Sequence, residues 1–368
     1  MKKHGIVYRE TKSTFAYAGW PTVAKGNDGR IYAVCSGHRL GHICPFGKNY
    51  MFTSSDGGES WSMPTVINDT YLDDRDAGLL ITKSGRMIMS YFCHSRDFYI
   101  TRCDEFIKHF FSFPEARGLY LGAVEYLKSM PESKNTFGSF IRISDNGGKN
   151  WSDAVNIPVS SPHGPIELRD GRILYLGKHF RSMHDQNMRA YDGIEAFESR
   201  DGGESWEKIA EVSMPDGCTG KNVHEPYAIE LPDGTLVGAI RAQGDEVEYG
   251  FTIYMTYSYD GGRSWTKPQP TGICGSPPHF LLHSSGALIM TYGRREKPYG
   301  ERAVISYDGG KSFGEEIILS DHAPSSDLGY PSSVELDDGS ILTVYYQRYG
   351  ADNHASILST KWRIDDER

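Results

Sequence analysis

One eight-residue pattern, Ser-x-Asp-x-Gly-x-x-Trp, occurs five times in this chain of 368 residues and constrains its fold more than any other feature. One copy has Asn in place of Asp, and another has Phe in place of Trp. The copies occupy residues 54–61, 144–151, 199–206, 258–265 and 306–313. Paired glycines after the acidic residue predict a tight hairpin, because Gly accepts a positive φ and the Asp side chain caps the turn. We interpret the pattern as a structural turn without a catalytic role, and its recurrence predicts a radial or stacked array.

Six glycine turns are interleaved with this pattern, and each is followed by an apolar, strand-like segment. The turn glycines are Gly29, Gly85, Gly171, Gly234, Gly286 and Gly339, spaced 56, 86, 63, 52 and 53 residues apart. Each unit then holds one pair of strands around the glycine turn and a second pair around the longer pattern. Six such units predict an all-β fold, a six-bladed β-propeller with four-stranded antiparallel blades. The sixth unit lacks the longer pattern, so we expect residues 6–8 to supply its last strand and close the ring.

One such ring accounts for nearly the whole length, so we expect residues 1–368 to form a single domain. The widest spacing, between Gly85 and Gly171, marks an insertion at about residues 95–136 in the second blade. Residues 114–128 within it have Ala, Glu and Leu at helical spacing. Insertions of this kind often border an active site, and a solvated surface loop is the alternative.

Composition excludes several classes of function. The net charge of −9 argues against a nucleic-acid partner. The six cysteines are scattered without a C-x-x-C spacing, so we expect no zinc site and no disulfide framework. None of the candidate functions considered below requires another metal or a cofactor, and we expect none. No long apolar run follows the N-terminus, so we expect neither a signal peptide nor a membrane span, and a cytoplasmic location unless a leader was removed.

Aligning the six units on their turn glycines identifies equivalent positions in the blades. The residues nine positions before each glycine are Trp20, Asp76, Pro162, Glu225, Pro277 and Tyr330. The first strand of every propeller blade lines the central channel, so Asp76, Glu225 and Tyr330 are expected to converge. Arg75 and His224 precede two of these positions, and returning strands bring Arg39, Arg241 and Arg295 to the same mouth. The planar arginine fork suits carboxylates, which predicts an anionic ligand; ion pairs between blades are the alternative.

The repeated patterns resemble the Asp-boxes, or BNR repeats, of the sialidase superfamily, from about Phe15 to Trp362. The segment 224–227 followed by Arg241 is similar to the sialidase segment with the catalytic Glu and an arginine for the substrate carboxylate. The segment 329–333 looks like the one with the nucleophilic Tyr. The resemblance implies that Tyr330 is the nucleophile and Glu225 its base, since a phenol with a pKa of roughly 10 needs one at neutral pH. It places the third arginine at Arg302, in preference to Arg295.

The chain departs from the sialidase pattern in its first blade. Trp20 stands where sialidases have the arginine of an Arg-Ile-Pro sequence. Arg39 is followed by residues 40–44 without a carboxylate, where sialidases have an acid/base Asp. We hypothesise that Arg75 and Asp76, one blade away, supply both missing functions.

Three functions agree with these residues. The first is removal of a terminal sialic acid or related acidic sugar by Tyr330, Glu225 and Asp76. The second is a propeller glycosidase for another glycan, such as one with uronic acid, with a histidine moving the proton. The third is a carbohydrate-binding propeller without catalysis. The expected partner is an anionic carbohydrate, with no nucleic acid and no membrane, and the predicted substrate-binding residues are Trp20, Arg39, Arg75, His163, His224, Arg241, His279, Arg295 and Arg302.

Overall fold

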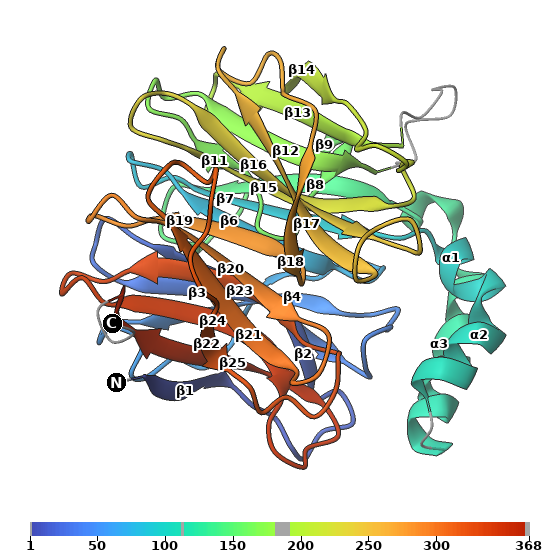
Figure 1. Cartoon of the computed structure of the whole chain (residues 1–368). Coiled ribbons are helices and arrows are strands. Elements are labelled where there is room, and N and C mark those ends of the chain that lie inside the picture. Colours follow the sequence, from blue (N-terminus) through green and yellow to red (C-terminus); the bar gives the residue numbers. More distant parts are fainter. Residues whose placement is uncertain (1, 112–113, 181–191, 365–368) are drawn as a thin grey trace.

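Six antiparallel sheets are arranged radially around a central axis in the computed structural model (Figure 1). The structure describes residues 2–111, 114–180 and 192–364. Each sheet has four strands in radial order, apart from one sheet whose inner strand is interrupted. The prediction of a six-bladed β-propeller with four-stranded blades is confirmed.

The blades follow one another along the chain. Blade 1 holds β2 (Tyr17–Lys25), β3 (Ile31–Arg39), β4 (Lys48–Ser54) and β5 (Thr65–Asn68), and blade 2 holds β6 (Arg75–Ile81), β7 (Met87–Cys93), β8 (Gly138–Ser144) and β9 (Val155–Ile157). Blade 3 holds β10 (Val159–Ser160) and β11 (Ile166–Glu167), which both pair with β12 (Ile173–His179), then β13 (Ile194–Ser199) and β14 (Glu207–Val212). Blade 4 holds β15 (Val223–Glu230), β16 (Leu236–Gln243), β17 (Phe251–Ser258) and β18 (Gln269–Cys274). Blade 5 holds β19 (Pro278–Leu282), β20 (Leu288–Arg294), β21 (Gly300–Ser306) and β22 (Ile317–Ser320).

Blade 6 closes the ring with strands from both ends of the chain. It holds β23 (Gly329–Glu335), β24 (Ile341–Arg348), β25 (Ala355–Trp362) and, at its outer edge, β1 (Lys3–Tyr8). Ile6 lies opposite Leu358 in this antiparallel pair. The expected closure by residues 6–8 is therefore confirmed, and it ties the first blade to the last through backbone hydrogen bonds.

The Ser-x-Asp-x-Gly-x-x-Trp segments are turns between the third and fourth strands of their blades. In the first, Ser54 Oγ donates to Asp56 Oδ1 at 2.8 Å and accepts from the Gly58 amide at 2.9 Å. The Asp56 carboxylate also accepts from the Ser60 amide at 2.9 Å. The other four copies repeat the bonds made by the serine. These turns satisfy their polar groups locally, as the sequence predicts.

A helical insertion leaves blade 2 and packs beside the propeller (Figure 1). It contains α1 (Arg96–Thr101), α2 (Cys103–Phe110), α3 (Pro114–Ser129) and the short 3-10 helix η1 (Glu132–Lys134). Helix α3 covers the segment with helical spacing, whereas α1 and α2 are additional. None of the described helices is both long and apolar enough to cross a membrane.

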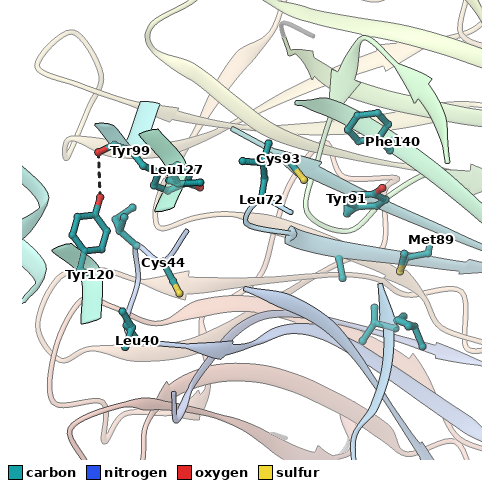
Figure 2. Close-up of a cluster of buried hydrophobic side chains, with 14 of the residues drawn as sticks. Leu40, Cys44, Leu72, Met89, Tyr91, Cys93, Tyr99, Tyr120, Leu127 and Phe140 are labelled. Carbon is teal, nitrogen blue, oxygen red and sulfur yellow. Dashed lines mark hydrogen bonds between the residues drawn. The ribbon is translucent and has the colours of Figure 1, made fainter. Parts of the chain in front are cut away.

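The insertion shares one apolar core with blades 1 and 2 (Figure 2). Tyr99, Tyr120 and Leu127 from the helices are fully buried there, together with Leu72 and Met89 from the propeller side. The Tyr120 hydroxyl donates to the backbone oxygen of Tyr99 at 3.5 Å. The insertion is thus a packed unit rather than a solvated loop, and it is anchored next to the mouth of the channel.

Candidate functional site

Four blades place a non-glycine residue in left-handed backbone at the predicted ring. The φ angles are 56° at Trp20, 51° at Asp76, 42° at Glu225 and 53° at Tyr330. In each blade the pairing of the first two strands shifts register across this residue. Bulges of this kind redirect a side chain, and left-handed backbone costs a non-glycine residue of order 1–3 kcal/mol. The strain therefore coincides with the positions found by aligning the repeat.

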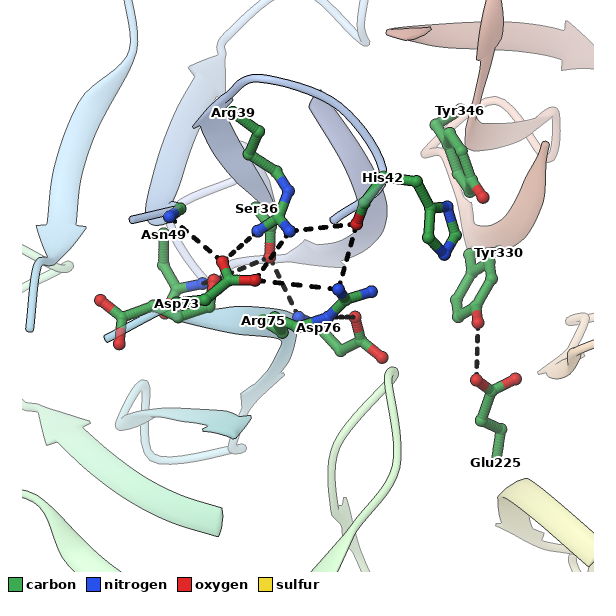
Figure 3. Close-up of polar contacts among 12 residues, drawn as sticks. Ser36, Arg39, His42, Asn49, Asp73, Arg75, Asp76, Glu225, Tyr330 and Tyr346 are labelled. Atoms are coloured by element: carbon green, nitrogen blue, oxygen red, sulfur yellow. Dashed lines mark hydrogen bonds and ion pairs between the residues drawn. The ribbon is translucent and has the colours of Figure 1, made fainter. Parts of the chain in front are cut away.

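Tyr330, Glu225 and Arg241 form one hydrogen-bonded group across blades 4 and 6 (Figure 3 shows the first two). The Tyr330 hydroxyl donates to Glu225 Oε1 at 2.6 Å. Arg241 Nη1 donates to Glu225 Oε2 at 2.5 Å and to the Tyr330 hydroxyl oxygen at 3.2 Å. The other side of the Arg241 guanidinium binds Gln243 Oε1. The arrangement couples a phenol to an ionisable acceptor inside the mouth.

The charges of this group follow from its surroundings. Burial raises the pKa of Tyr330 well above its usual value, and the nearby Glu225 charge raises it further. Burial alone would also raise the pKa of Glu225, but Arg241 and the Tyr330 hydrogen bond lower it to about 2. The resting site consequently holds a neutral phenol against an ionised carboxylate.

Asp76 is the second carboxyl group of the ring. It is buried, and its Oδ1 has no hydrogen-bond partner among the described residues. Burial raises its pKa to about 7; Arg75, whose Nε lies 3.9 Å from Asp76 Oδ1, opposes the shift, and Glu225 adds to it. Asp76 can therefore hold a proton close to neutral pH, which suits a group that donates to a ligand.

Arg39 is committed to a structural ion pair. Its guanidinium binds both oxygens of Asp73, with Nη2 at 2.8 Å from Oδ2, and both side chains are fully buried (Figure 3). Trp20 lies against this pair, since its ring centre is 4.8 Å from Arg39 Cζ and 4.3 Å from Arg75 Cζ. Arg39 therefore makes an ion pair between blades, the alternative to the ligand contact expected from the sequence. Trp20 provides a flat cation–π surface where the resemblance has an arginine.

Arg302 and Arg295 occupy different places in blade 5. Arg302 is almost fully buried; its guanidinium binds backbone oxygens of Glu301, Ser320 and Pro298 and the Glu316 carboxylate. Arg295 instead lies over the Tyr330 ring, with its Cζ 5.8 Å from the ring centre. The structure does not support the preference for Arg302, and Arg295 is the one it brings to Tyr330.

The three predicted histidines lie at different levels of the site. His163 and His279 are buried one or two residues further along the inner strands, with ring centres 4.9 Å apart. Burial lowers the pKa of His163 to about 3 and that of His279 well below its usual value. They contact Thr22, Tyr227 and Ser332, so five blades contribute to this layer beneath the ring. His224 stands at the mouth and binds the Lys221 backbone oxygen at 2.9 Å.

Two site residues were not predicted, His42 and Asp327. They lie in loops outside the repeat, where alignment on the glycine turns gives no position. His42 occupies the loop after Arg39 in which the sequence departs from sialidases, and that departure was the one available signal. Asp327 lies three residues before Tyr330. Among the described residues no three His, Cys, Asp or Glu side chains are grouped as a metal site would require.

The sequence matches the model of the BNR repeat-like domain over residues 124–343. The chain belongs to this family. This match confirms the BNR repeats that the repeated turns resemble.

Solved structures share the propeller at low identity. A Dyadobacter fermentans protein of unknown function has a TM-score of 0.76 at 22% identity over 98% of both chains. The NanB sialidase of Streptococcus pneumoniae has a TM-score of 0.68 at 14% identity, covering 98% of this chain and 70% of that one. An α-L-arabinofuranosidase of Fusarium graminearum has a TM-score of 0.63 at 11% identity over 99% and 98%. At these identities the likeness establishes the fold, which glycosidases of several specificities use.

One curated relative is similar in sequence. It is a xyloglucanase of a Paenibacillus species, 26% identical over 204 residues. The match covers 49% of this BNR-repeat chain and only 18% of the relative. The activity of that longer protein is therefore not transferred to this one.

Proposed function

We propose that this protein is a glycoside hydrolase of the sialidase type, which removes a terminal sialic acid or related acidic sugar. The observation that carries the proposal is the partly buried hydrogen bond of 2.6 Å between Tyr330 and Glu225. Two strained ring positions from different blades meet in this bond. A purely structural pair would gain nothing from such backbone, whereas a nucleophile and its base must be held in one geometry.

The chemistry follows from the charges. Tyr330 attacks the anomeric carbon while its proton passes to Glu225, which is ionised and ready to accept it. A phenol has the further advantage that it brings no negative charge towards an anionic sugar. A substrate carboxylate that binds Arg241 competes with Glu225 for the guanidinium, and this raises the pKa of Glu225 when the base is needed.

An acidic sugar is favoured by the cations around Tyr330. Arg241 contacts its hydroxyl, Arg295 lies over its ring, and Arg75 stands beside Asp76. These arginines come from different blades, in a chain with a net charge of −9. Local positive charge in an acidic protein attracts an anionic ligand to this one place.

The proposal also needs a group that gives a proton to the leaving oxygen. The sequence names Asp76, and its pKa of about 7 agrees with a proton donor near neutral pH. Trp20 in place of the first arginine favours the second candidate function, a propeller glycosidase for another glycan such as one with uronic acid. The arabinofuranosidase fold relative and the xyloglucanase sequence relative add support to it.

A panel of 4-methylumbelliferyl glycosides tests the proposal, with α-sialoside, uronide and arabinofuranoside members. We expect turnover of the sialoside or another acidic member, and loss of that turnover in Glu225→Gln. Turnover of neutral members alone would replace the proposal by the second function. Binding without turnover of any member would favour a carbohydrate-binding propeller.

A further inference from the structure

His42 and Asp327 form an oriented pair at the mouth of the channel. His42 Nδ1 lies 3.0 Å from Asp327 Oδ1. Asp327 also accepts from the Tyr17 and Tyr346 hydroxyls, each at 3.0 Å. The carboxylate therefore selects the tautomer with hydrogen on Nδ1, which leaves Nε2 for other partners. Among the described residues Nε2 has no hydrogen-bond partner.

The ring of His42 is held on two sides beside the proposed nucleophile. One side meets Trp20 edge-on at 5.1 Å between ring centres, and the other stacks on Phe110 of the insertion at 5.8 Å. Trp20 and Tyr346 in turn lie 6.4 and 5.8 Å from the Tyr330 ring. Figure 3 draws the His42 side chain between Arg39 and the rings of Tyr346 and Tyr330. The insertion thus helps to position a histidine one ring away from the Tyr330–Glu225 bond.

His42 and Asp76 are the two candidate proton donors, and they differ in their access to the side from which a leaving group departs. His163 and His279 beneath the ring are buried, so we expect the part of a glycan beyond its terminal sugar to extend from the mouth into solvent. The His42 side chain is 33% exposed, whereas that of Asp76 is 7% exposed. A donor to the leaving oxygen must reach this outer side, and incoming water arrives by the same route.

We propose that His42, positioned by Asp327, is the acid and base for the leaving oxygen and the incoming water, which refines and rests on the proposed glycosidase function. In the first step the Tyr330 oxygen bonds to the anomeric carbon and its proton moves to Glu225. The bond to the leaving oxygen breaks, and that oxygen takes the Nε2 proton of charged His42. In the second step water gives a proton to neutral His42 and attacks the anomeric carbon. The bond to Tyr330 then breaks, and Glu225 returns the proton to its oxygen.

The surroundings of His42 agree with this assignment. Burial lowers the pKa of His42; Asp327 opposes the shift, and the charges of Arg75 and Arg39 reinforce it. Tyr17 and Tyr346 face the pair as neutral hydroxyls, and Phe110 contributes no charge. The donating form is therefore populated on the acid side of neutrality, and cleavage that needs the donor should fall as pH rises. Asp76 remains free to donate a hydrogen bond to the sugar itself.

Two substrates of the same acidic sugar test the inference. The 4-methylumbelliferyl glycoside has a leaving group that needs little protonation, whereas a lactose-linked glycoside such as sialyllactose needs a proton. We expect His42→Gln to lower kcat/KM about 100-fold or more for the lactose-linked substrate and less than about 10-fold for the activated one. On the activated substrate kcat and KM should fall together, because the intermediate accumulates. Asp327→Asn should move the alkaline limb of the pH profile for the lactose-linked substrate to lower pH.

His322→Gln is the matched control, since the His322 side chain is 83% exposed and should leave both rates unchanged. Thermal unfolding checks that each variant is folded. If His42→Gln does not fold, Asp327→Asn takes its place as the test of the role of His42. Equal losses on both substrates would overturn the role of His42 and leave the glycosidase proposal standing. So would a loss that depends on the leaving group in Asp76→Asn but not in His42→Gln. A wild-type protein that hydrolyses no glycoside of the panel would overturn both proposals.

Discussion

Asp56 and Asp76 are aspartates of neighbouring blades, and one is exposed to solvent whereas the other is buried. Asp56 is exposed in an outer turn, and hydrogen bonds from Ser60 and Ser54 lower its pKa to about 2. Asp76, at the channel mouth, has a buried oxygen without a hydrogen-bond partner among the described residues, and burial raises its pKa to about 7. The outer turns place glycines in left-handed backbone, whereas the mouth places Trp20, Asp76, Glu225 and Tyr330 there. Five blades thus have self-sufficient turns at one end, and four have a strained non-glycine residue at the other end, where Asp76 Oδ1 lacks a hydrogen-bond partner among the described residues.

The largest expected effect at the mouth is on catalysis. Tyr330→Phe removes the proposed nucleophile and should lower kcat/KM by at least about 1000-fold on the substrate identified by the glycoside panel. Tyr345→Phe is the control, because Tyr345 lies in the same blade and bonds to Thr360 away from the ring. Full activity in Tyr330→Phe, measured by steady-state kinetics, would exclude the tyrosine mechanism.

The next effect is on stability. Most substitutions of buried residues lower the free energy of unfolding, whereas this one should raise it. The pKa of Asp76 is raised by folding from 3.8 to about 7, so the folded state binds more protons between these values and stability is lost as pH rises through them. Asp76→Asn removes this loss and should raise the free energy of unfolding at pH 8 by ~2–4 kcal/mol, with no gain at pH 4. Urea unfolding at both pH values measures the difference. An equal change at the two pH values would show that Asp76 does not carry the shift.

A packing change below the ring should have a smaller effect. A Cβ added at Gly78 in β6 would lie 2.5 Å from the backbone nitrogen of Gly164, in the segment between β10 and β11. Gly78→Ala should therefore cost about 1–3 kcal/mol in urea unfolding. Gly118→Ala is the control, because a Cβ there meets nothing within 4 Å and α3 should gain from alanine. Similar stability in Gly78→Ala and the wild type would mean that the backbone at Gly164 can move to accommodate the added methyl group.

The smallest effect is expected in the outer turn. Asp56→Asn keeps an acceptor for the Ser60 amide, as Asn146 does for Asn150 in the second copy of the turn. Because folding lowers the pKa of Asp56, its stabilisation is present above the unfolded value of 3.8 and is lost as pH falls through about 2. The variant should be slightly less stable than the wild type at pH 7 and equal to it at pH 2 by thermal unfolding. A larger loss of stability in Asp56→Asn than in Gly78→Ala would contradict the proposed difference between the outer turn and the mouth.

The ring positions were predictable because the repeat acts as a register. Strand pairing fixes the distance from each turn glycine to the mouth, so one offset found Trp20, Asp76, Glu225 and Tyr330 in four blades. The choice between Arg302 and Arg295 could not be made in this way. Arg302 lies in the third strand of its blade, where its charge is absorbed by Glu316 and backbone oxygens. Arg295 follows the second strand, whose end reaches Tyr330.

The sequence by itself determined the propeller, its closure and the level at which three proposed catalytic residues meet. These features depend on hydrogen bonds within a few residues or on the fixed period of two residues along a strand. Only the tertiary structure decided that Arg39 is neutralised by Asp73, that the insertion packs against the mouth, and that His42 is held by Asp327. These contacts join loops whose lengths the repeat does not set, and the free energy of burying a charge decides their partners only after the chain has folded.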